Sequence, residues 1–438
     1  MHGTSLSGTE QRFDVTGIAR VEGEGSLRLH VRDGAVVEAH LAIFEAPRYF
    51  EQLVVGRTPD EVLDIVARIC GICPIAYQMS AVHAFEAAAG VTIDPAVHAL
   101  RRLLYCGEWI ESHALHVYLL HAPDFLGRAN AMELAQIDRP AVERGLFMKR
   151  VGNRLVSILG GRPIHPVSVR VGGFSSAPNV EALRAIRPEL ETALAGAQAT
   201  VDWVATFEAP VFERDARLVS LRHPTEYPMS AGRIVSSDGL DLALTDWEAA
   251  FAESQVPWSH ALQSRSLDGR AYLLGPSARV TLAGGQLHPE ARAALDRIGL
   301  AREIERNPYW SIAARSVELV HALAEALDIV DGYVRPDRPS VPWTPGPGVA
   351  AWATEAPRGL LFHRYDLDER GRIAKAKIVP PTSQNQAAIE DDLAAFAPSV
   401  LAEPHEVALG RLEQLIRSYD PCISCATHFL DLSVEDES

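Results

Sequence analysis

Two short cysteine motifs are the part of this sequence best suited to chemistry. Cys70 and Cys73 are separated by two residues, and Cys422 and Cys425 repeat that spacing near the other end of the 438-residue chain. This spacing lets both sulfurs of one turn face the same ion, and two such pairs form a tetrathiolate suited to zinc, nickel or iron. The sequence therefore predicts a metal site that joins the two ends of the chain.

A closed four-cysteine zinc site would use the same residues. Structural zinc sites usually gather their ligands within a small domain, whereas these two pairs are separated by most of the chain. Pro74 opens an apolar helical pattern directly after the first pair, and the N-terminus of a helix lowers the pKa of neighbouring thiols. We therefore expect Cys70 and Cys73 to be thiolates in a buried reactive centre, with the zinc site as the alternative.

Composition limits the partners of the protein. A net charge of −16 argues against binding to nucleic acid or to an anionic membrane surface. No run of about eighteen apolar residues predicts a membrane span, and the N-terminus lacks a signal pattern, so a cytoplasmic location is expected. Of the five cysteines, only Cys106 lies outside the two pairs, and its apolar surroundings predict a buried core thiol. The chain also lacks the glycine motifs that bind dinucleotides or ATP.

The elements that must position these residues are mainly helices. Hydrophobic periodicity predicts a mainly α fold with minor β, in which a bundle of long helices is flanked by peripheral antiparallel strands. Because the cysteine pairs must meet, residues 1–438 are expected to form a single domain. The predicted strand regions are 12–45, with a hairpin turn at Asp33-Gly34, a β-containing insertion at about 218–285, and 359–365 and 373–379. The predicted helices include 94–121, 139–159, 180–207 and several within 289–330, with later ones beginning at Asn385 and His405.

Together with their flanking residues, the two motifs resemble those of the large, catalytic subunit of nickel–iron hydrogenases. The resemblance extends from the N-terminus to His428 and is weakest in the middle third. It implies a nickel ion held by all four cysteines, with Cys70 and Cys422 as terminal ligands. Cys73 and Cys425 would bridge to an iron that carries cyanide and carbon monoxide. Soft thiolates allow nickel to change oxidation state, which zinc does not do.

The same resemblance assigns a proton relay and a second metal site. Glu22, in Arg-Val-Glu-Gly, matches the glutamate that takes protons from a terminal cysteine such as Cys422; an isolated carboxylate is otherwise expected to face solvent. Glu51, the backbone carbonyl of Ile378, and His428 match the ligands of a magnesium ion. These assignments are implied by the resemblance alone.

Three further segments resemble those that surround the metal pair. Arg358, after Pro357, matches an arginine held above the metals, where a guanidinium could bind cyanide or assist hydrogen cleavage. Asp420 matches the carboxylate that pairs with this arginine; an Asp before proline is otherwise typical of a turn. Pro381 and Thr382 resemble a loop that hydrogen-bonds the second cyanide.

The finer features resemble the soluble, bidirectional, NAD(P)-coupled subgroup, of the sulfhydrogenase alpha-subunit type. Tyr77 stands where many members have a histidine, and Ser112 where respiratory members have an aspartate. Because no further cysteine set is present, the resemblance implies a small partner subunit with iron–sulfur clusters and diaphorase subunits with FAD and NAD(P). It also implies a maturation protease that removes residues 429–438. The remaining alternative is a non-catalytic, hydrogenase-like scaffold subunit, although that relative has lost the four cysteines.

Overall fold

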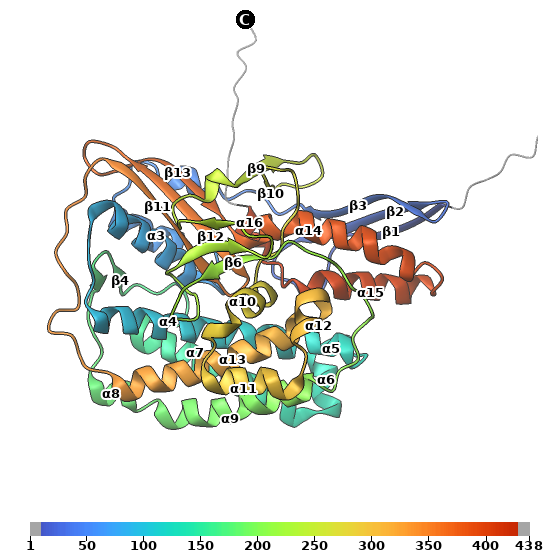
Figure 1. The fold of residues 1–438 in the computed structure, drawn as a ribbon, viewed down its shortest axis with the longest axis horizontal. Helices are drawn as coiled ribbons and strands as arrows, with labels where there is room; N and C mark the ends of the chain where they lie inside the picture. The colour runs from blue at the N-terminus through green and yellow to red at the C-terminus, as the bar shows by residue number, and fades with distance from the viewer. Residues whose placement is uncertain (1–9, 428–438) are drawn as a thin grey trace, which may run out of the picture.

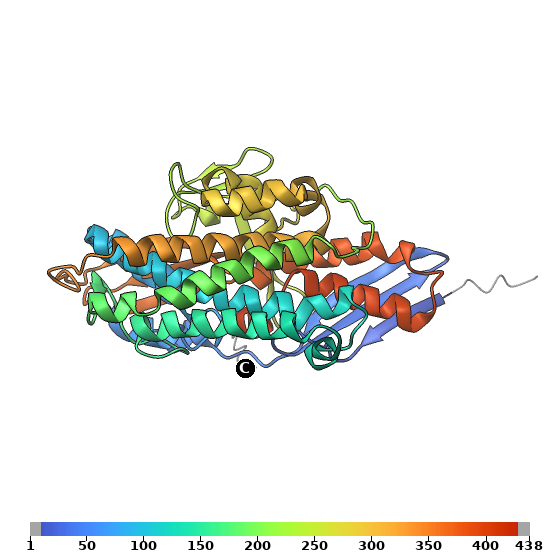
Figure 2. The same cartoon turned by 90° about the horizontal axis from the view of Figure 1, so that it is seen from below.

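Long helices form one layer of the fold, and small antiparallel sheets with shorter helices form the other (Figure 1). The computed structural model describes residues 10–427. In the helical layer α4 packs against α7 and α13, and α13 packs against α9, so the four helices lie side by side (Figure 2). They are α4 (Pro95–Leu115), α7 (Arg139–Gly160), α9 (Arg187–Val204) and α13 (Ser311–Gly332). This arrangement confirms the predicted mainly α fold with peripheral antiparallel strands.

Two three-stranded meanders dominate the other layer. The first begins the described chain, and its hairpin turn falls at Asp33 and Gly34, whose positive φ angles of 53° and 77° suit Asp-Gly. The second packs against α3, the helix that follows the first cysteine pair. The meanders are β1 (Glu10–Val15), β2 (Gly25–Arg32) and β3 (Ala35–Ile43), then β11 (Gly348–Ala356), β12 (Gly359–Leu367) and β13 (Ile373–Val379).

Residues 218–285 contain five short strands and one α-helix. Buried residues such as Val219 and Leu221 pack with Ala353 and Phe362 of the second meander in one apolar cluster. The segment is therefore fastened to the sheet that leads to Arg358. Its elements are β6 (Val219–Arg222), β7 (Arg233–Ser236), β8 (Asp241–Leu242), β9 (Phe251–Gln255), β10 (Leu262–Ser266) and α10 (Pro276–Ala283).

Shorter elements connect these layers. The remaining α-helices are α1 (Phe50–Leu53), α2 (Pro59–Val66), α3 (Pro74–Ala89), α5 (Ala122–Phe125), α6 (Ala131–Ile137), α8 (Val180–Arg184), α11 (Pro289–Ile298), α12 (Ala301–Arg306), α14 (Pro381–Phe396), α15 (His405–Ser418) and α16 (Ile423–Ala426). There are also two small strands, β4 (Val169–Arg170) and β5 (Gly173–Phe174), and a short π-helix, η1 (His116–His121). Within residues 10–427 no helix combines the length and the apolar character needed to cross a membrane.

Two predicted boundaries are wrong, and one strand is absent from the prediction. The single helix predicted over 180–207 is two helices, because Pro188 cannot donate an amide hydrogen to a preceding turn and a new helix begins beside it. Strand β11 lies just after a proline-rich crossing and was not predicted. Helix α14 begins at Pro381 rather than Asn385, so Pro381 and Thr382 lie in a first helical turn and not in a loop.

Candidate metal centre

The two cysteine pairs meet in the main hydrophobic core. All four sulfurs lie within 4.8 Å of one another, and all four side chains are buried. The Cys70 and Cys422 sulfurs are 3.4 Å apart, and the Cys73 and Cys425 sulfurs are 3.6 Å apart. Within residues 10–427 this is the one group of three or more potential ligand side chains close enough to share an ion.

Helix starts hold both pairs in place. Cys73 caps α3, whose first helical residue is Pro74, and Cys422 caps the short helix α16. The backbone amides of Ile72 and Cys73 donate to the Cys70 sulfur at 3.3 and 3.4 Å, as expected for a thiolate at a helix start. The prediction that α3 begins at Pro74 is therefore confirmed.

Glu22 faces the second pair. Residues Glu22 and Cys422 form an isolated parallel bridge between segments from opposite ends of the chain. The Glu22 carboxylate lies 3.1 Å from the Cys422 sulfur and accepts the backbone amide of Ser424 at 3.0 Å. Its side chain is therefore directed at the cysteines, and not at solvent as an isolated strand glutamate would be.

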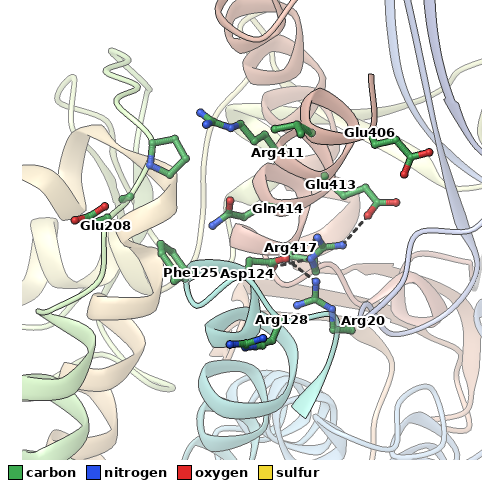
Figure 3. Close-up of a pocket in the computed structure, with 15 residues that line it drawn as sticks. Arg20, Asp124, Phe125, Arg128, Glu208, Glu406, Arg411, Glu413, Gln414 and Arg417 are labelled. Atoms are coloured by element: carbon green, nitrogen blue, oxygen red, sulfur yellow. Dashed lines mark hydrogen bonds and ion pairs between the residues drawn. The ribbon is translucent and has the colours of Figure 1, made fainter. Parts of the chain in front are cut away.

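An ion-pair network fixes the segment that presents Glu22. Arg20, which has a positive φ of 60°, contacts the Asp124 carboxylate at 2.5 Å and donates to the Leu120 carbonyl at 2.7 Å. Arg417 binds the same carboxylate with two donors at 2.8 Å. Figure 3 shows these charges beside a cleft of about 540 Å³ that separates them from Glu208. The cleft is lined by Arg20, Asp124 and Arg417, which fix the segment that carries Glu22, whereas the four cysteines are buried in the main hydrophobic core.

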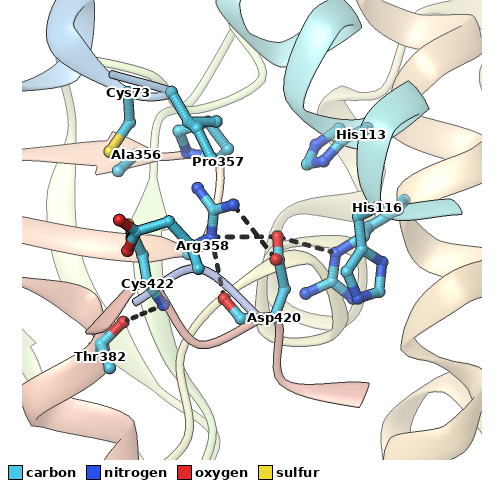
Figure 4. Close-up of polar contacts among 12 residues, drawn as sticks. Cys73, His113, His116, Ala356, Pro357, Arg358, Thr382, Asp420 and Cys422 are labelled. Atoms are coloured by element: carbon cyan, nitrogen blue, oxygen red, sulfur yellow. Dashed lines mark hydrogen bonds and ion pairs between the residues drawn. The ribbon is translucent and has the colours of Figure 1, made fainter. Parts of the chain in front are cut away.

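Arg358 and Asp420 form a buried pair next to the cysteines (Figure 4). Arg358 Nε donates to the Asp420 carbonyl at 2.8 Å, and Nη2 donates to its carboxylate at 3.1 Å. Burial opposes the charge, but Asp420 and then Cys422 raise the pKa of Arg358 well above its ordinary value. Its Nη1 is buried and has no hydrogen-bond partner among residues 10–427. A charged donor is thus left over for a group bound at the cysteines.

Asp420 also sets the path of the chain into the second pair. It adopts a left-handed conformation with φ of 52°, which costs energy for a non-glycine residue and which Asp tolerates better than most. A second buried arginine, Arg315, lies 4.0 Å from its carboxylate, and burial lowers the pKa of that guanidinium to about 10. The turn therefore carries a carboxylate between two arginines.

Comparison with known proteins agrees with this geometry. The profile of the family described as nickel-dependent hydrogenase matches residues 48–141 and 258–428. The sulfhydrogenase 1 alpha subunit of Pyrococcus furiosus is 32% identical over 421 residues, covering 95% of this chain and 97% of that one. The chain belongs to the nickel-dependent hydrogenase family.

Other relatives extend this result to the whole fold. The beta subunit of the NAD-reducing hydrogenase HoxS of Cupriavidus necator is 26% identical, with 94% of each chain covered. A crystal structure of an NAD+-reducing [NiFe]-hydrogenase superposes with a TM-score of 0.87 at 26% identity, covering 96% of this chain and 100% of that one. The [NiFeSe] hydrogenase of Desulfovibrio vulgaris Hildenborough, at 22% identity and a TM-score of 0.79, shares the fold. The protein is the large subunit of a hydrogenase.

The cysteine cluster of this hydrogenase fits nickel and iron. Hydrogen bonds from Cys422, Cys425 and Cys73 hold the pKa of Cys70 well below its usual range. Contact with Cys425 and Cys70 raises the pKa of Cys422 well above its usual range. Four buried sulfurs so close together cannot all lose their protons unless a cation compensates the charge. The donor set is soft, dry and preassembled, which suits these metals.

Several predicted residues lie around the cluster without touching its sulfurs in the described contacts. The Thr382 hydroxyl accepts the backbone amide of Cys422 at 3.0 Å (Figure 4), so the first turn of α14 abuts the second pair. Pro357 precedes Arg358 in the turn between β11 and β12. The Glu51 carboxylate accepts the backbone amide of Ile378 at 2.7 Å, so two of the predicted magnesium ligands are neighbours. The third, His428, lies outside the described residues.

Two residues beside Glu22 escaped the sequence analysis. The Ser424 hydroxyl donates to the Glu45 carboxylate at 2.9 Å, while the Ser424 amide donates to Glu22. Ser424 stands inside the second cysteine motif, but serine there carries no chemical signal. Glu45 follows strand β3 at no motif spacing, and only the fold brings it to α16. Glu22 and Glu45 are thus linked through one residue.

Proposed function

We propose that this protein catalyses the reversible reaction H2 ⇌ 2 H+ + 2 e−, as the large subunit of a complex that exchanges electrons with NAD(P). The observation that carries the proposal is the buried four-cysteine cluster with a carboxylate on one side and an unsatisfied guanidinium on the other. When bound by the four cysteines, a nickel–iron group with cyanide and carbon monoxide on the iron supplies the site at which hydrogen is cleaved. A closed zinc site would need neither flanking group.

Glu22 is proposed to move the proton. Its carboxylate is within hydrogen-bonding reach of the Cys422 sulfur, so a proton held there has an acceptor at 3.1 Å. Ser424 and Glu45 offer the next positions toward the surface, through the hydroxyl and carboxylate contacts given above. The proton therefore leaves by the side of the cluster that faces the N-terminal sheet.

Arg358 and Thr382 are proposed to orient the diatomic ligands of the iron. Arg358 is fixed by two bonds to Asp420, which leaves Nη1 as the donor available to such a ligand. Pro357 and Pro381 begin the turn and the helix that carry these two side chains. Both side chains lie close to Cys422 (Figure 4).

A magnesium ion is proposed near the C-terminal end of the described chain. Glu51 supplies a carboxylate beside the Ile378 backbone, and oxygen ligands of this kind suit magnesium. His428 would complete the protein ligands. Metal analysis should then find magnesium in addition to nickel and iron in the loaded protein. Glu51→Gln should lose magnesium before it loses nickel or iron. Full retention of magnesium in that variant would contradict the assignment.

Electrons are proposed to leave through a partner subunit that carries iron–sulfur clusters. The loop after α7 lies against α3, the helix that follows the first cysteine pair, since the Gln78 amide of α3 donates to its Pro166 carbonyl at 2.8 Å. Ile164 and Val167 of this loop are 53% and 49% exposed, although both are apolar. A docked small subunit would cover them. Cross-linking of the complex should place this loop against the small subunit, and cross-links confined to other faces would refute the location.

The complex is proposed to be cytoplasmic, with FAD- and NAD(P)-binding diaphorase subunits beyond the small subunit. The name of the NAD-reducing relative supports this choice of acceptor. A maturation protease is proposed to remove residues 429–438, a segment outside the described residues. The family profile also ends at His428. Intact-mass measurement of the active subunit tests the cleavage, and an active chain that still ends at Ser438 would refute it.

The reaction is tested on the complex purified from its own host. Hydrogen-dependent reduction of NAD or NADP, together with nickel and iron in the large subunit, is the expected result. Replacing any of Cys70, Cys73, Cys422 or Cys425 with Ala should abolish activity, because the centre cannot replace a missing thiolate. Cys106→Ala is the matched control, since this buried thiol in α4 is not a member of the four-cysteine group, and the variant should remain active. Zinc without nickel, or an active variant of the four, would refute the proposal.

A further inference from the structure

Arg279 of α10 sits at the centre of a fully buried ion network. Its side chain is 0% exposed, as are those of its partners Glu318 and Glu355. Nε and Nη2 donate to the two Glu318 oxygens at 2.7 and 2.8 Å, and Nη1 donates to Glu355 at 2.9 Å. The other bonds from Nη1 and Nη2 go to the backbone carbonyls of Ala356 and Pro357, both at 2.9 Å.

Those two carbonyls belong to the residues directly before Arg358. The turn from Ala356 to Gly359 joins β11 to β12, and besides Arg358 it contains only alanine, proline and glycine, whose side chains form no hydrogen bonds. The planar guanidinium of Arg279 binds two successive carbonyls of this turn and anchors them to two carboxylates. The backbone on which Arg358 stands is therefore tied to α10 and α13.

Gly275, the residue before α10, also packs against this turn. A Cβ on Gly275 would lie 2.9 Å from the Arg358 carbonyl oxygen, and Gly275 has a φ of +103°. Only glycine suits such a position. The Arg358 turn thus lies between the first residues of α10 and the Arg279 side chain, with little room to shift.

This network costs more than an apolar core would. Taking one arginine and two glutamates out of water carries a large desolvation penalty, and well-packed apolar replacements of buried ion networks are often as stable or more stable. The arginine also lies over the Trp109 ring, at 4.4 Å from its centroid, and His113 Nε2 lies 2.9 Å from Glu318. The contribution of these charges is therefore geometric, because each hydrogen bond fixes the orientation of the groups that it joins.

We propose that Arg279 is a positioning residue of the hydrogenase, which sets the orientation of Arg358 over the metal centre through the Ala356 and Pro357 carbonyls. The inference rests on the role proposed above for Arg358. It adds a positioning residue that none of the motifs in the sequence indicates.

The test compares two matched arginines in the nickel-loaded complex. Arg279→Lys keeps the charge but cannot bind two carboxylates and two carbonyls at once. Turnover is expected to fall by about 10- to 100-fold, the size typical of a misplaced catalytic group, with nickel content unchanged and with shifted infrared bands of the carbon monoxide and cyanide ligands. Arg102→Lys is the control, because Arg102 also joins two glutamates, Glu325 and Glu226, to a carbonyl, that of Tyr227. Its turnover and infrared bands should match the wild type.

Either of two results overturns the inference. One is wild-type turnover and bands in Arg279→Lys, and the other is an equal loss in Arg102→Lys, which would mark a general packing effect. If Arg279→Lys does not load nickel, the inference is tested with Gly275→Ala instead. The added methyl group presses on the Arg358 carbonyl while every charge stays in place. Unshifted infrared bands in Gly275→Ala would overturn the inference as well. Arg358→Lys separates the two proposals, since wild-type turnover in that variant would refute the role of Arg358 itself.

Discussion

Glu22 and Cys422 are 400 positions apart in the sequence, yet the carboxylate and the sulfur lie 3.1 Å apart. At the scale of single residues this contact has a direct consequence. Glu22→Gln preserves the shape and the bond from the Ser424 amide but removes the group that carries a proton. Turnover should fall by about 100-fold or more, while nickel and iron remain bound. Hydrogen oxidation assays combined with metal analysis measure both quantities.

Glu24→Gln is the control for this prediction. Glu24 is two residues away, exposed, and has no described side-chain bond, so its loss should leave turnover unchanged. A fully active Glu22→Gln variant would mean that protons leave by another side of the cluster. Ser424→Ala should reproduce part of the Glu22 effect if the relay continues toward Glu45.

A second residue-scale prediction concerns Glu111 of α4. Burial raises the pKa of Glu111 to about 8, although Lys149 acts to lower it. In the unfolded chain the same group titrates near 4.5, so folding above that pH requires proton uptake and costs stability. Glu111→Gln removes this cost. Its melting temperature should equal that of the wild type near pH 4, exceed it increasingly as the pH rises toward 8, and then keep a constant excess.

Thermal melts of the metal-free protein across this pH range measure the effect. Glu143→Gln on α7 is a suitable control, because Glu143 is exposed and its ion pair is with Arg139, one turn earlier in the same helix. An excess for Glu111→Gln that does not vary with pH would contradict the prediction, since it would come from packing rather than from protonation.

At this scale the sequence predicts residues whose chemistry is visible in their type and spacing. The cysteine motifs could be located because CxxC spacing has a direct geometric meaning, whereas Glu22 and Arg358 were implied by the resemblance of their segments to the family. Ser424, Glu45 and Arg279 could not be found in this way. Each acts through a contact between segments that only the folded chain brings together, and serine, glutamate and arginine are ordinary surface residues elsewhere.

At the scale of elements, helices α4 and α7 approach each other closely at two glycines. A Cβ on Gly152 would lie 2.7 Å from the Gly107 carbonyl oxygen, so these two helices touch backbone to backbone. Gly152→Ala must push them apart. We expect a loss of about 1–3 kcal/mol in unfolding free energy, as for other overpacked cores, and a lower hydrogenase activity because α4 carries the buried residues beneath the first cysteine pair.

Gly410→Ala in α15 is the matched control for Gly152→Ala. No atom lies within 4 Å of the Cβ that this change would add, and Gly410 is on the exposed face of the helix. Alanine should raise the unfolding free energy by about 0.5–1 kcal/mol through its higher helix propensity. Denaturant titration of both variants measures the contrast, and a Gly152→Ala protein as stable as the wild type would show that the two helices can separate freely.

Helices and strands could be predicted where the local sequence signals agreed, but not where contacts with other parts of the chain determine the conformation. Pro74 begins α3, and Asp33-Gly34 turns the first hairpin, as the sequence predicts. The apolar pattern of 180–207 continues across Pro188 and hides the break between α8 and α9. Strand β11 follows a proline-rich crossing and contains small residues, so its strand character depends on pairing with β12.

At the scale of the whole molecule, the metal centre is where the two ends of the chain meet. The Ile423 amide donates to the Glu22 carbonyl at 3.0 Å, and the Arg48 amide donates to the Thr427 carbonyl at 2.7 Å. The N-terminal sheet, the first cysteine pair and the second pair therefore close on one another around the cluster. The single-domain organisation predicted for residues 1–438 is proposed on this basis.

This closure predicts that metal loading stabilises the whole chain. An ion held by both pairs ties residue 70 to residue 422 only in the folded state, and a ligand at a thousand times its dissociation constant adds about 4 kcal/mol to the unfolding free energy. Protein produced without nickel should melt at a lower temperature, and a protease should cut it faster in the segment after α15 than it cuts the loaded protein. Cys422→Ser should behave as the metal-free form under either growth condition, whereas Cys106→Ser should still respond to nickel. Equal melting temperatures and equal cleavage rates with and without nickel would show that the two ends are held together by protein contacts alone.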